Sequence, residues 1–230
     1  MDVSGFLLVD KPAGWTSHDV VAHIRRMSGI KKVGHGGTLD PMATGLLVIG
    51  LGSATKQLER FVQGDKTYVA EVTLGATTAT DDAEGTVEPT AGATDPGRPA
   101  AEAALEGFAG DIEQLPPTYS AIKTGGKKAY AEARQGRTVE RQPRSVTIRS
   151  VELLDYAWPE ARFRTTVSKG TYIRALARDL GERLGTGGYL SGLRREKVGD
   201  LDVRDAVGAD VIDGPWYVLE RRLTKPEQAV

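Results

Sequence analysis

One carboxylate lies inside a glycine-rich stretch and is the strongest candidate for a reactive group. Asp40 stands in the segment GHGGTLDPMATG, residues 34–45. Pro41 biases the preceding residue toward extended backbone, and the surrounding glycines allow another chain to approach closely. The segment lacks the GK[ST] ending of a phosphate-binding loop and the G-x-G-x-x-G pattern that opens a dinucleotide-binding helix. The fragment alone is compatible with a chemically active aspartate or with an ordinary turn aspartate before proline.

Composition excludes several other chemistries. The chain of 230 residues has no cysteine, so disulfides, thiolate nucleophiles and zinc fingers are absent. Its histidines, at positions 18, 23 and 35, are too scattered in sequence to form a metal cluster. The N-terminus shows no basic region before an apolar stretch, and no apolar run approaches the length of a membrane span. We therefore expect a soluble, cytoplasmic protein.

The formal net charge of -1 hides an uneven distribution. Residues 76–114 include nine acidic side chains and one arginine, and residues 122–149 include eight basic side chains and two glutamates. A second basic group comprises Lys169, Arg174, Arg178, Arg183, Arg194, Arg195 and Lys197. Such basic regions can hold a phosphate backbone, although solvated helix or hairpin surface explains them equally well.

The elements that would position these residues are a mixture of strands and helices. Residues 6–9 and 46–49 read as short buried strands, with residues 10–14 as a turn after the first. A helix capped by Thr16 or Ser17 should end at Gly29. Residues 67–74 alternate, which places Tyr68 on the apolar face of a strand.

The second half of the chain continues the same mixture. We expect an irregular loop at 90–97, a short helix at 100–108, strands near 146–154 and 162–167, and a helix over 172–184 ended by Gly185. No internal repeat is visible. Intermixed strands and helices favour an α+β sheet protein.

Five segments occur in order along the chain: DKPAGWTSHDVV, GHGGTLDPMATGLLVIGLG, KTYVAEVTLG, PPTYSAIKTGGKKAYAEARQG, and KGTYIRALARDLG followed by LRREKVG. Together they resemble the TruB family of pseudouridine synthases, which convert a uridine in the tRNA T-loop, at position 55, to pseudouridine. They span about residues 5–199, and chance agreement of several ordered motifs is far rarer than one motif match. The resemblance implies the pseudouridine synthase fold: a mixed, mostly antiparallel central sheet flanked by helices, with a thumb-like RNA-binding insertion at about 115–145.

The resemblance also assigns chemistry. Asp40 would either attack C1' of the ribose or remove the C2' proton to give a glycal, and the sequence does not choose between these routes. Arg174 matches the family arginine that pairs with this aspartate. Tyr68 matches the tyrosine that stacks on the target uracil. Isomerisation involves no net redox change, so neither cofactor nor metal is expected.

Further residues match family positions that contact RNA. Tyr172 would line the same pocket, Leu193 would help to enclose the base, and His35 would lie against nucleotides displaced when the base is flipped. Lys11, with Pro12, would support the floor of the site. The thumb-like insertion would grip the RNA stem through phosphate contacts from Lys123, Lys127, Lys128, Arg134 and Arg137.

The resemblance has two departures. Tyr189 stands where the family commonly has a histidine, and about thirty residues follow Gly199, too few for the C-terminal PUA-type domain of bacterial relatives. We therefore expect a catalytic domain over 1–199 and a short extension over 200–230. The expected partner is the T-arm of tRNA, without guide RNA or membrane, and the expected state is a monomer.

Two other function classes remain to be tested. A silent RNA-binding or tRNA-folding module is disfavoured by the intact set of Asp40, Tyr68 and Arg174. A small-molecule nucleosidase or glycosidase is disfavoured by the basic thumb and by the lack of a second acid within the matched motifs.

Overall fold

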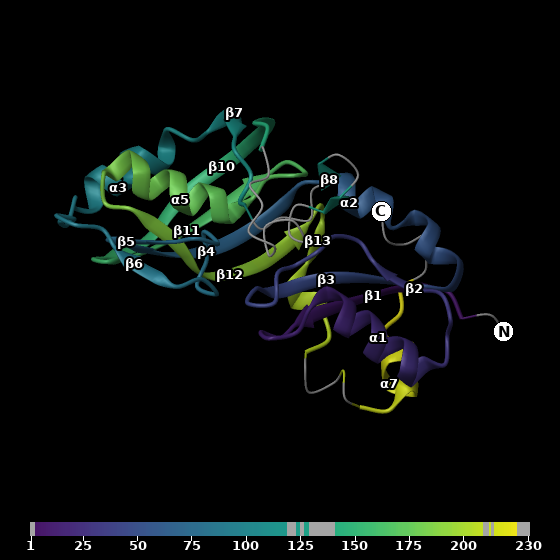
Figure 1. Cartoon of the computed structure of the whole chain (residues 1–230). Helices are drawn as coiled ribbons and strands as arrows, with labels where there is room; N and C mark the ends of the chain where they lie inside the picture. Colours follow the sequence, from purple (N-terminus) through teal and green to yellow (C-terminus); the bar gives the residue numbers. More distant parts are fainter. Residues whose placement is uncertain are drawn as a thin grey trace. The chain divides into compact units, whose positions relative to one another are not determined.

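The computed structural model describes residues 3–118, 123–124, 127–128, 141–208, 212 and 214–224. The chain forms two compact units. Unit 1 comprises residues 1–68 and 193–230, and unit 2 comprises residues 69–192. The chain leaves unit 1 within strand β4 (Lys66–Leu74) and returns within strand β12 (Gly188–Val198), as Figure 1 allows the reader to follow.

Unit 1 is built around β3 (Thr44–Leu51), the buried strand that the sequence predicts. It pairs antiparallel with β1 (Gly5–Lys11) and β2 (Val33–His35), and parallel with β12 through Thr44–Arg194 and Gly45–Arg195. Its alternate residues enter two clusters. Leu47 and Ile49 pack in a cluster that includes α1 (Ser17–Ser28), and Leu46 and Val48 pack in one that includes residues of η1 (Gly52–Gln57) and α2 (Glu59–Gln63). Burial of both faces explains the continuous apolar run.

The start of unit 1 agrees with the sequence except at the end of β1. Thr16 caps α1 in a capping box with Asp19, and Gly29 ends the helix with φ 69°. The predicted turn at residues 10–14 begins two residues too early, because Asp10 and Lys11 still pair with Leu46 and Gly45 of β3. Pairing with a strand more than thirty residues away leaves no local signal in the sequence.

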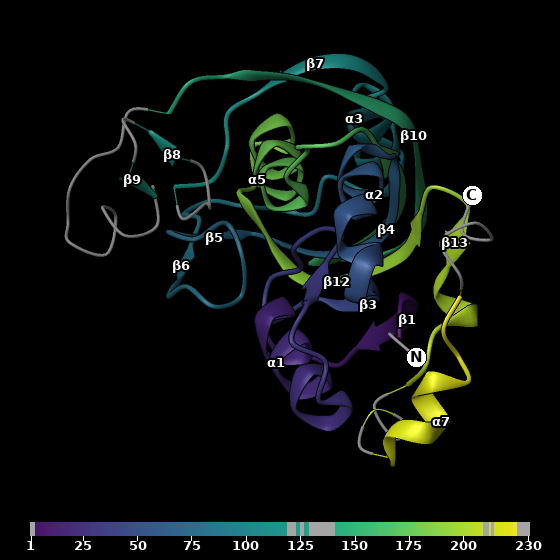
Figure 2. The same ribbon diagram turned by 90° about the vertical axis from the view of Figure 1, so that its right-hand side faces the viewer.

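Residues after 199 contribute to unit 1. They form β13 (Leu201–Asp202), η2 (Val203–Asp205) and α7 (Trp216–Glu220). Thr224 bridges to Phe6 of β1, and Leu219 is fully buried in the cluster that contains α1. Figure 2 labels α7, the helix that carries Leu219. The described residues of the C-terminal extension thus contribute to the core of unit 1.

Unit 2 is a sheet in the order β12-β4-β11-β10-β7. β10 (Arg144–Ala157) pairs antiparallel with β11 (Glu160–Val167) and with β7 (Gly110–Gln114). Two short antiparallel pairs lie outside this order, β5 (Ala76–Thr78) with β6 (Val87–Pro89) and β8 (Lys123–Thr124) with β9 (Lys127–Lys128).

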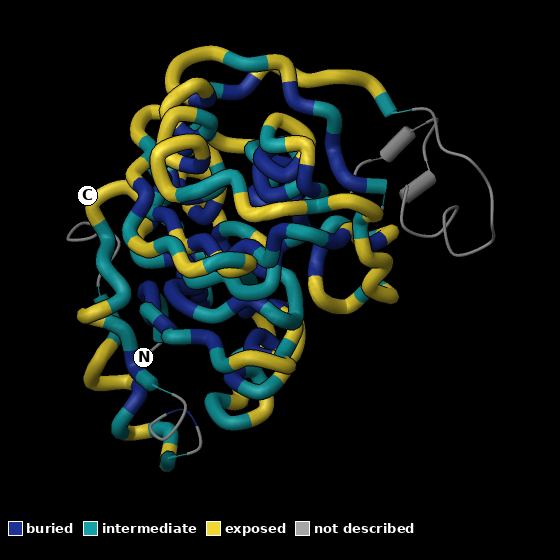
Figure 3. The backbone as a smooth tube through the Cα atoms, turned by 90° about the vertical axis from the view of Figure 1, so that its left-hand side faces the viewer, coloured by how far each residue is buried: buried dark blue, intermediate teal, exposed yellow. Residues whose placement is uncertain are grey.

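Helices α3 (Arg98–Glu106) and α5 (Ile173–Leu184) complete unit 2. Ile173, Leu176 and Leu180 of α5 are buried, and Gly185 ends the helix with φ 68° as predicted. Figure 3 colours the backbone by burial, with buried residues in dark blue. Gly181 has a packing reason to be glycine, since a Cβ there would lie 2.2 Å from the Gly187–Gly188 backbone.

The mixed, mostly antiparallel strands with flanking helices confirm the α+β expectation. The sequence reading omitted β7 and β12. Both carry charged or glycine residues at positions where an isolated amphipathic strand would show clean alternation. In the described part of the chain, no helix is long and apolar enough to span a membrane.

Candidate active site

Asp40 lies on the loop that joins β2 to β3, and the residues beside it are held by buried side chains. Leu39 donates its N–H to Ser17 Oγ at 2.8 Å, and the same hydroxyl lies 3.2 Å from the Leu39 carbonyl. Ser17 is 2% exposed at the first position of α1. The Ala43 N–H donates to the Asp40 carbonyl at 3.1 Å. The loop is therefore tied to the start of a helix next to its carboxylate-bearing residue.

Lys11 holds the loop on the other side of Asp40. Its ammonium donates to the carbonyls of Trp15 at 2.6 Å, Pro12 at 2.9 Å and Pro41 at 3.2 Å, and the side chain is fully buried. Burial lowers the pKa of Lys11 to about 8, against the opposing attraction of Asp40. The lysine expected to support the floor of the site is thus a three-way clamp on backbone oxygens.

Arg195, on β12, is the third group that holds this loop. It is 1% exposed and donates through Nε to the Leu46 carbonyl at 2.7 Å. Its Nη2 donates to the Gly37 carbonyl at 3.1 Å, and its Nη1 to that of Thr38 at 3.4 Å. Lys11 and Arg195 together place two cations beside the Asp40 loop, and both donate to its backbone carbonyls.

His35 is the last residue of β2, where it pairs with Ile49. Burial and the nearby Arg195 lower its pKa, against a hydrogen bond with the Gly37 backbone that raises it. The imidazole is therefore neutral at neutral pH. A neutral ring suits contact with bases better than contact with phosphate.

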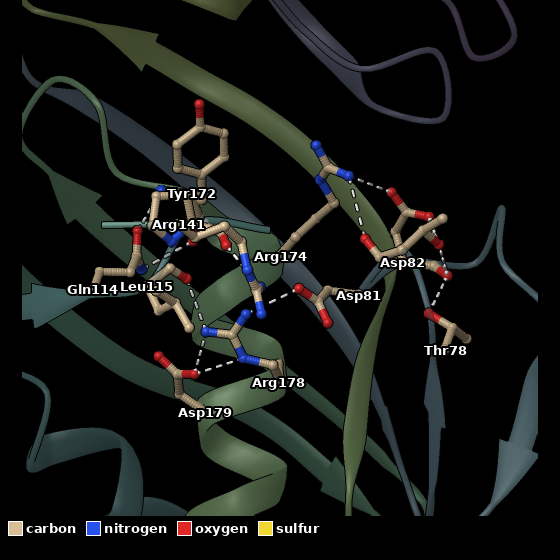
Figure 4. Close-up of polar contacts among 12 residues, drawn as sticks. Thr78, Asp81, Asp82, Gln114, Leu115, Arg141, Tyr172, Arg174, Arg178 and Asp179 are labelled. Carbon is tan, nitrogen blue, oxygen red and sulfur yellow. Dashed lines mark hydrogen bonds and ion pairs between the residues drawn. The ribbon is translucent and has the colours of Figure 1, made fainter. Parts of the chain in front are cut away.

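In unit 2, Arg174 lies in the first turn of α5, where the helix dipole does not favour a cation. It is 8% exposed and binds the Asp82 carboxylate at 3.1 Å and the Thr80 carbonyl at 3.2 Å (Figure 4). Asp82 is 2% exposed and also accepts from Thr80 Oγ1 and from the Glu84 N–H. Asp82 therefore supplies the negative charge that a buried arginine needs at the N-terminal end of a helix. The pairing of Arg174 with Asp40 stays a prediction.

One turn later on α5, Arg178 links three segments of unit 2. It contacts Asp81 at 3.0 Å, Asp179 at 2.7 Å and the carbonyl of Leu115 at 2.9 Å (Figure 4). Burial lowers the pKa of Arg178, but attraction to Asp179 and Asp81 outweighs it, and the pKa is raised. Arg178 is thereby charged and fully committed to contacts within the protein.

Tyr172 caps α5, and its backbone is fixed by Gln114 at the end of β7. Gln114 is 1% exposed, accepts the Tyr172 N–H at 2.8 Å, and donates to the Tyr172 carbonyl at 3.1 Å. Figure 4 shows the tyrosine ring pointing away from the Arg178 cluster. A residue directly before the predicted thumb thus orients a predicted pocket residue.

The remaining predicted site residues are placed as follows. Tyr68 is half-buried on β4, next in alternation to the buried Ala70 and Val72, and Leu193 is half-buried on β12. Lys123, Lys127 and Lys128 lie on β8 and β9, but their side chains are outside the described part of the structure. Arg134 and Arg137 lie outside the described residues.

Charge counting along the sequence misread several residues. Asp81 and Asp82 are internal ion-pair partners rather than acidic surface, and Arg174, Arg178 and Arg195 are committed inside the protein rather than available to phosphate. Ser17, Gln114 and Arg195 were missed as supports of the site. The LRREKVG match pointed to the region of Arg195, but only its burial reveals what it holds. Among the described residues, no group of three or more His, Cys, Asp or Glu could hold a metal.

The chain matches a family model described as TruB family pseudouridylate synthase, N-terminal domain, over residues 25–173. Curated relatives named tRNA pseudouridine synthase B are 51% identical in Leifsonia xyli and 47% identical in Thermobifida fusca. These matches cover 88% and 94% of this chain, and 70% and 76% of the relatives. The chain belongs to the TruB family. The Asp40 loop lies within the segment that the family model matches.

Solved structures agree on the fold. The chain matched in the crystal structure of a Cbf5–Nop10–Gar1 complex has a TM-score of 0.75 at 28% identity, over 98% of this chain and 61% of that one. The match in the crystal structure of an archaeal box H/ACA sRNP Nop10–Cbf5 complex has a TM-score of 0.74 at 27% identity, over 100% and 62%. This TruB-family chain therefore spans less than two thirds of those structural relatives.

Proposed function

We propose that this TruB-family chain isomerises a uridine in the T-loop of tRNA, at position 55, to pseudouridine. Support for tRNA as the substrate comes from the relatives of about 50% identity named tRNA pseudouridine synthase B. The single observation that carries the catalytic assignment is the Asp40 loop, in which Ser17, Lys11 and Arg195 hold the residues on both sides of one carboxylate.

The reaction breaks the C1'–N1 bond and forms a C1'–C5 bond. The proton on C5 leaves the base and N1 gains a proton, so the product is an isomer and no electrons are gained or lost. In one route the Asp40 carboxylate bonds to C1' as N1 departs, and is released when C5 attacks C1'. In the other, Asp40 removes the C2' proton to give a glycal and returns it after the base has turned. Either route uses one positioned carboxylate.

Access to the base requires that the uridine leave the stack of the T-loop. In this proposal Tyr68, Tyr172 and Leu193 surround the flipped uracil, and the neutral His35 lies against the displaced nucleotides. The proposal retains the family's pairing of Arg174 with Asp40, and Asp82 binds the same guanidinium. Lys123, Lys127, Lys128 and Arg134 supply salt-sensitive phosphate contacts.

The test is release of tritium from C5-labelled uridine in an unmodified tRNA transcript. We expect release by the wild type, and a fall of about 10³-fold or more in Asp40→Asn, because the amide is neither a nucleophile nor a base. Asp205→Asn, at an exposed aspartate of η2, is the control and should release tritium at the wild-type rate. A transcript with cytidine at position 55 should release nothing from the T-loop.

The outcomes separate the alternatives. Release that is equal in the wild type and Asp40→Asn would reject Asp40 as the reactive carboxylate. An absence of release with retained tRNA binding would leave an RNA-binding module instead. Free uracil as the product would indicate a nucleosidase.

A further inference from the structure

We infer that Arg195 is a positioning residue for Asp40, acting as a staple that holds together the two ends of the catalytic loop. This inference rests on the proposed role of Asp40. Residues 37 and 38 begin the loop and residue 46 lies just past its end, and all three carbonyls accept from the one guanidinium. Since Asp40 lies between these anchor points, the guanidinium limits how far its backbone can move.

The close approach of β12 to β3 explains why the staple reaches the loop. Arg195 is directly opposite Gly45 in the parallel pairing of these strands. A Cβ on Gly45 would lie 2.3 Å from the Arg195 carbonyl oxygen, and Gly45 has φ 101°. Only glycine fits this place. The end of the Asp40 loop is thus pressed against the backbone of the residue whose side chain holds its beginning.

The chemistry of the contacts argues for a fixed geometry. Arginine presents its N–H donors in a rigid planar fork, so three carbonyls bound by one guanidinium are fixed relative to one another. A lysine would supply a single ammonium on a flexible stem. With 1% of its surface exposed, Arg195 is also unavailable to an RNA phosphate. Its contribution to the reaction therefore passes through the loop.

Strand β12 also carries a second residue of the proposed site. Leu193 and Arg195 are two residues apart on β12, so their side chains leave the same side of the strand. In the proposed site, one strand then supplies both the apolar residue that helps to enclose the base and the guanidinium that sets the loop carrying the carboxylate. Movement of β12 would shift both together.

The experiment measures kcat and KM for tritium release, and unfolding by urea, for Arg195→Lys, Arg195→Ala and a matched control. The control is Arg25→Ala, because Arg25 also donates to a backbone carbonyl of unit 1, that of Val33 at 3.0 Å, but does not hold the Asp40 loop. We expect kcat of Arg195→Ala to fall about 100-fold, as a misplacement of about 1 Å can produce, with KM changed less than about twofold. Arg195→Lys should lose about 10-fold in kcat. Arg25→Ala should keep the wild-type kcat.

Chemical rescue of kcat separates a positioning role from general destabilisation, because added guanidinium ion can replace only the missing side-chain group. Millimolar guanidinium ion, far below denaturing concentrations, should restore part of the kcat of Arg195→Ala and leave Arg25→Ala unaffected. If Arg195→Ala does not fold, kcat of Arg195→Lys is measured instead, because this variant retains a buried cation.

Folded Arg195 variants with wild-type kcat would overturn the positioning role, while the proposed function would stand if the wild type releases tritium. A fall confined to KM would also overturn it. Absence of release by the wild type would instead reject the proposed function itself.

Discussion

The two units handle buried cations in different ways. In unit 1, Lys11 and Arg195 each donate to three backbone carbonyls, among them those of Pro41, Gly37 and Thr38 in the Asp40 loop. In unit 2, Arg174 and Arg178 bind the carboxylates of Asp82, Asp81 and Asp179. Carbonyl clamps fix backbone position without adding negative charge, whereas ion pairs neutralise the cations that they hold.

The difference has an electrostatic consequence. Around Asp40, Lys11 and Arg195 donate to neutral carbonyls, and burial lowers the pKa of Lys11 to about 8, against the attraction of Asp40. Around Arg178 the attraction of Asp179 and Asp81 outweighs burial and raises the pKa of the arginine. Unit 1 thus holds a carboxylate-bearing loop with two buried cations that donate to its backbone, and unit 2 uses charge pairs as structural connections.

The strongest test of the ion-pair side of this comparison is Asp82→Asn. It removes the negative charge bound to the buried Arg174, and we expect the free energy of unfolding to fall by about 3 to 5 kcal/mol. Urea unfolding measures the effect. The control Glu152→Gln breaks the exposed pair with Arg164, whose N–O distance is 3.6 Å, and should change stability by less than about 1 kcal/mol. Equal losses in the two variants would contradict the distinction between buried and exposed pairs.

The carbonyl-clamp side is tested by the pH dependence of Lys11→Met. Between pH 8 and 10.5 the folded wild type has lost the Lys11 proton while the unfolded chain retains it. The unfolded state then binds more protons, so this group makes the free energy of unfolding rise with pH, by up to about 3 kcal/mol over the interval. Urea unfolding from pH 7 to 10.5 should show a rise in the wild type, relative to Lys11→Met. Parallel profiles would show that Lys11 titrates normally.

A smaller effect is expected where a neutral side chain does the holding. Gln114→Leu removes both hydrogen bonds to the Tyr172 backbone and should lower the free energy of unfolding by about 2 kcal/mol. It should also lower kcat/KM for tritium release, because Tyr172 loses its orientation. The control Gln57→Leu, at an exposed position, should change stability by less than about 0.5 kcal/mol. Wild-type kcat/KM in folded Gln114→Leu would reject Gln114 as a support of the site.

The finest test compares two neighbouring hydroxyls. Thr16→Ala removes the side-chain cap of α1, and Ser17→Ala removes the hydrogen bonds to Leu39. Each substitution should lower the free energy of unfolding by about 1 kcal/mol. Because only Ser17 touches the Asp40 loop, only Ser17→Ala should lower kcat for tritium release. Equal loss of kcat in both would mean that the loop depends on the whole helix start rather than on one hydroxyl.

Local signals in the sequence were read well. The capping box at Thr16, the glycine that ends α1, and the buried run of β3 follow from rules that act within a few residues. Glycines, a proline and a carboxylate singled out the Asp40 loop, and the resemblance to the TruB family then gave the carboxylate its expected role. The sequence mispredicted elements that depend on pairing with distant strands: β1 extends to Lys11, and β12 was not predicted.

The same limit applies to charge. Asp82 and Arg174 are more than ninety residues apart and were counted as parts of separate surfaces, yet they form one buried pair. Arg195 was counted as a cation for phosphate, although its donors are used by the Asp40 loop. Linear charge counts do not report burial, and burial decides whether a charge faces solvent or supports the fold.

The sequence by itself determined the family, the class of fold and the carboxylate at the centre of the proposed chemistry, because ordered motifs and local backbone preferences are written in neighbouring residues. Only the tertiary structure decided which side chains hold that carboxylate in place. Lys11, Ser17 and Arg195 come from three elements and meet at one loop, and such a meeting depends on strand pairing and on the requirement that every buried donor find an acceptor.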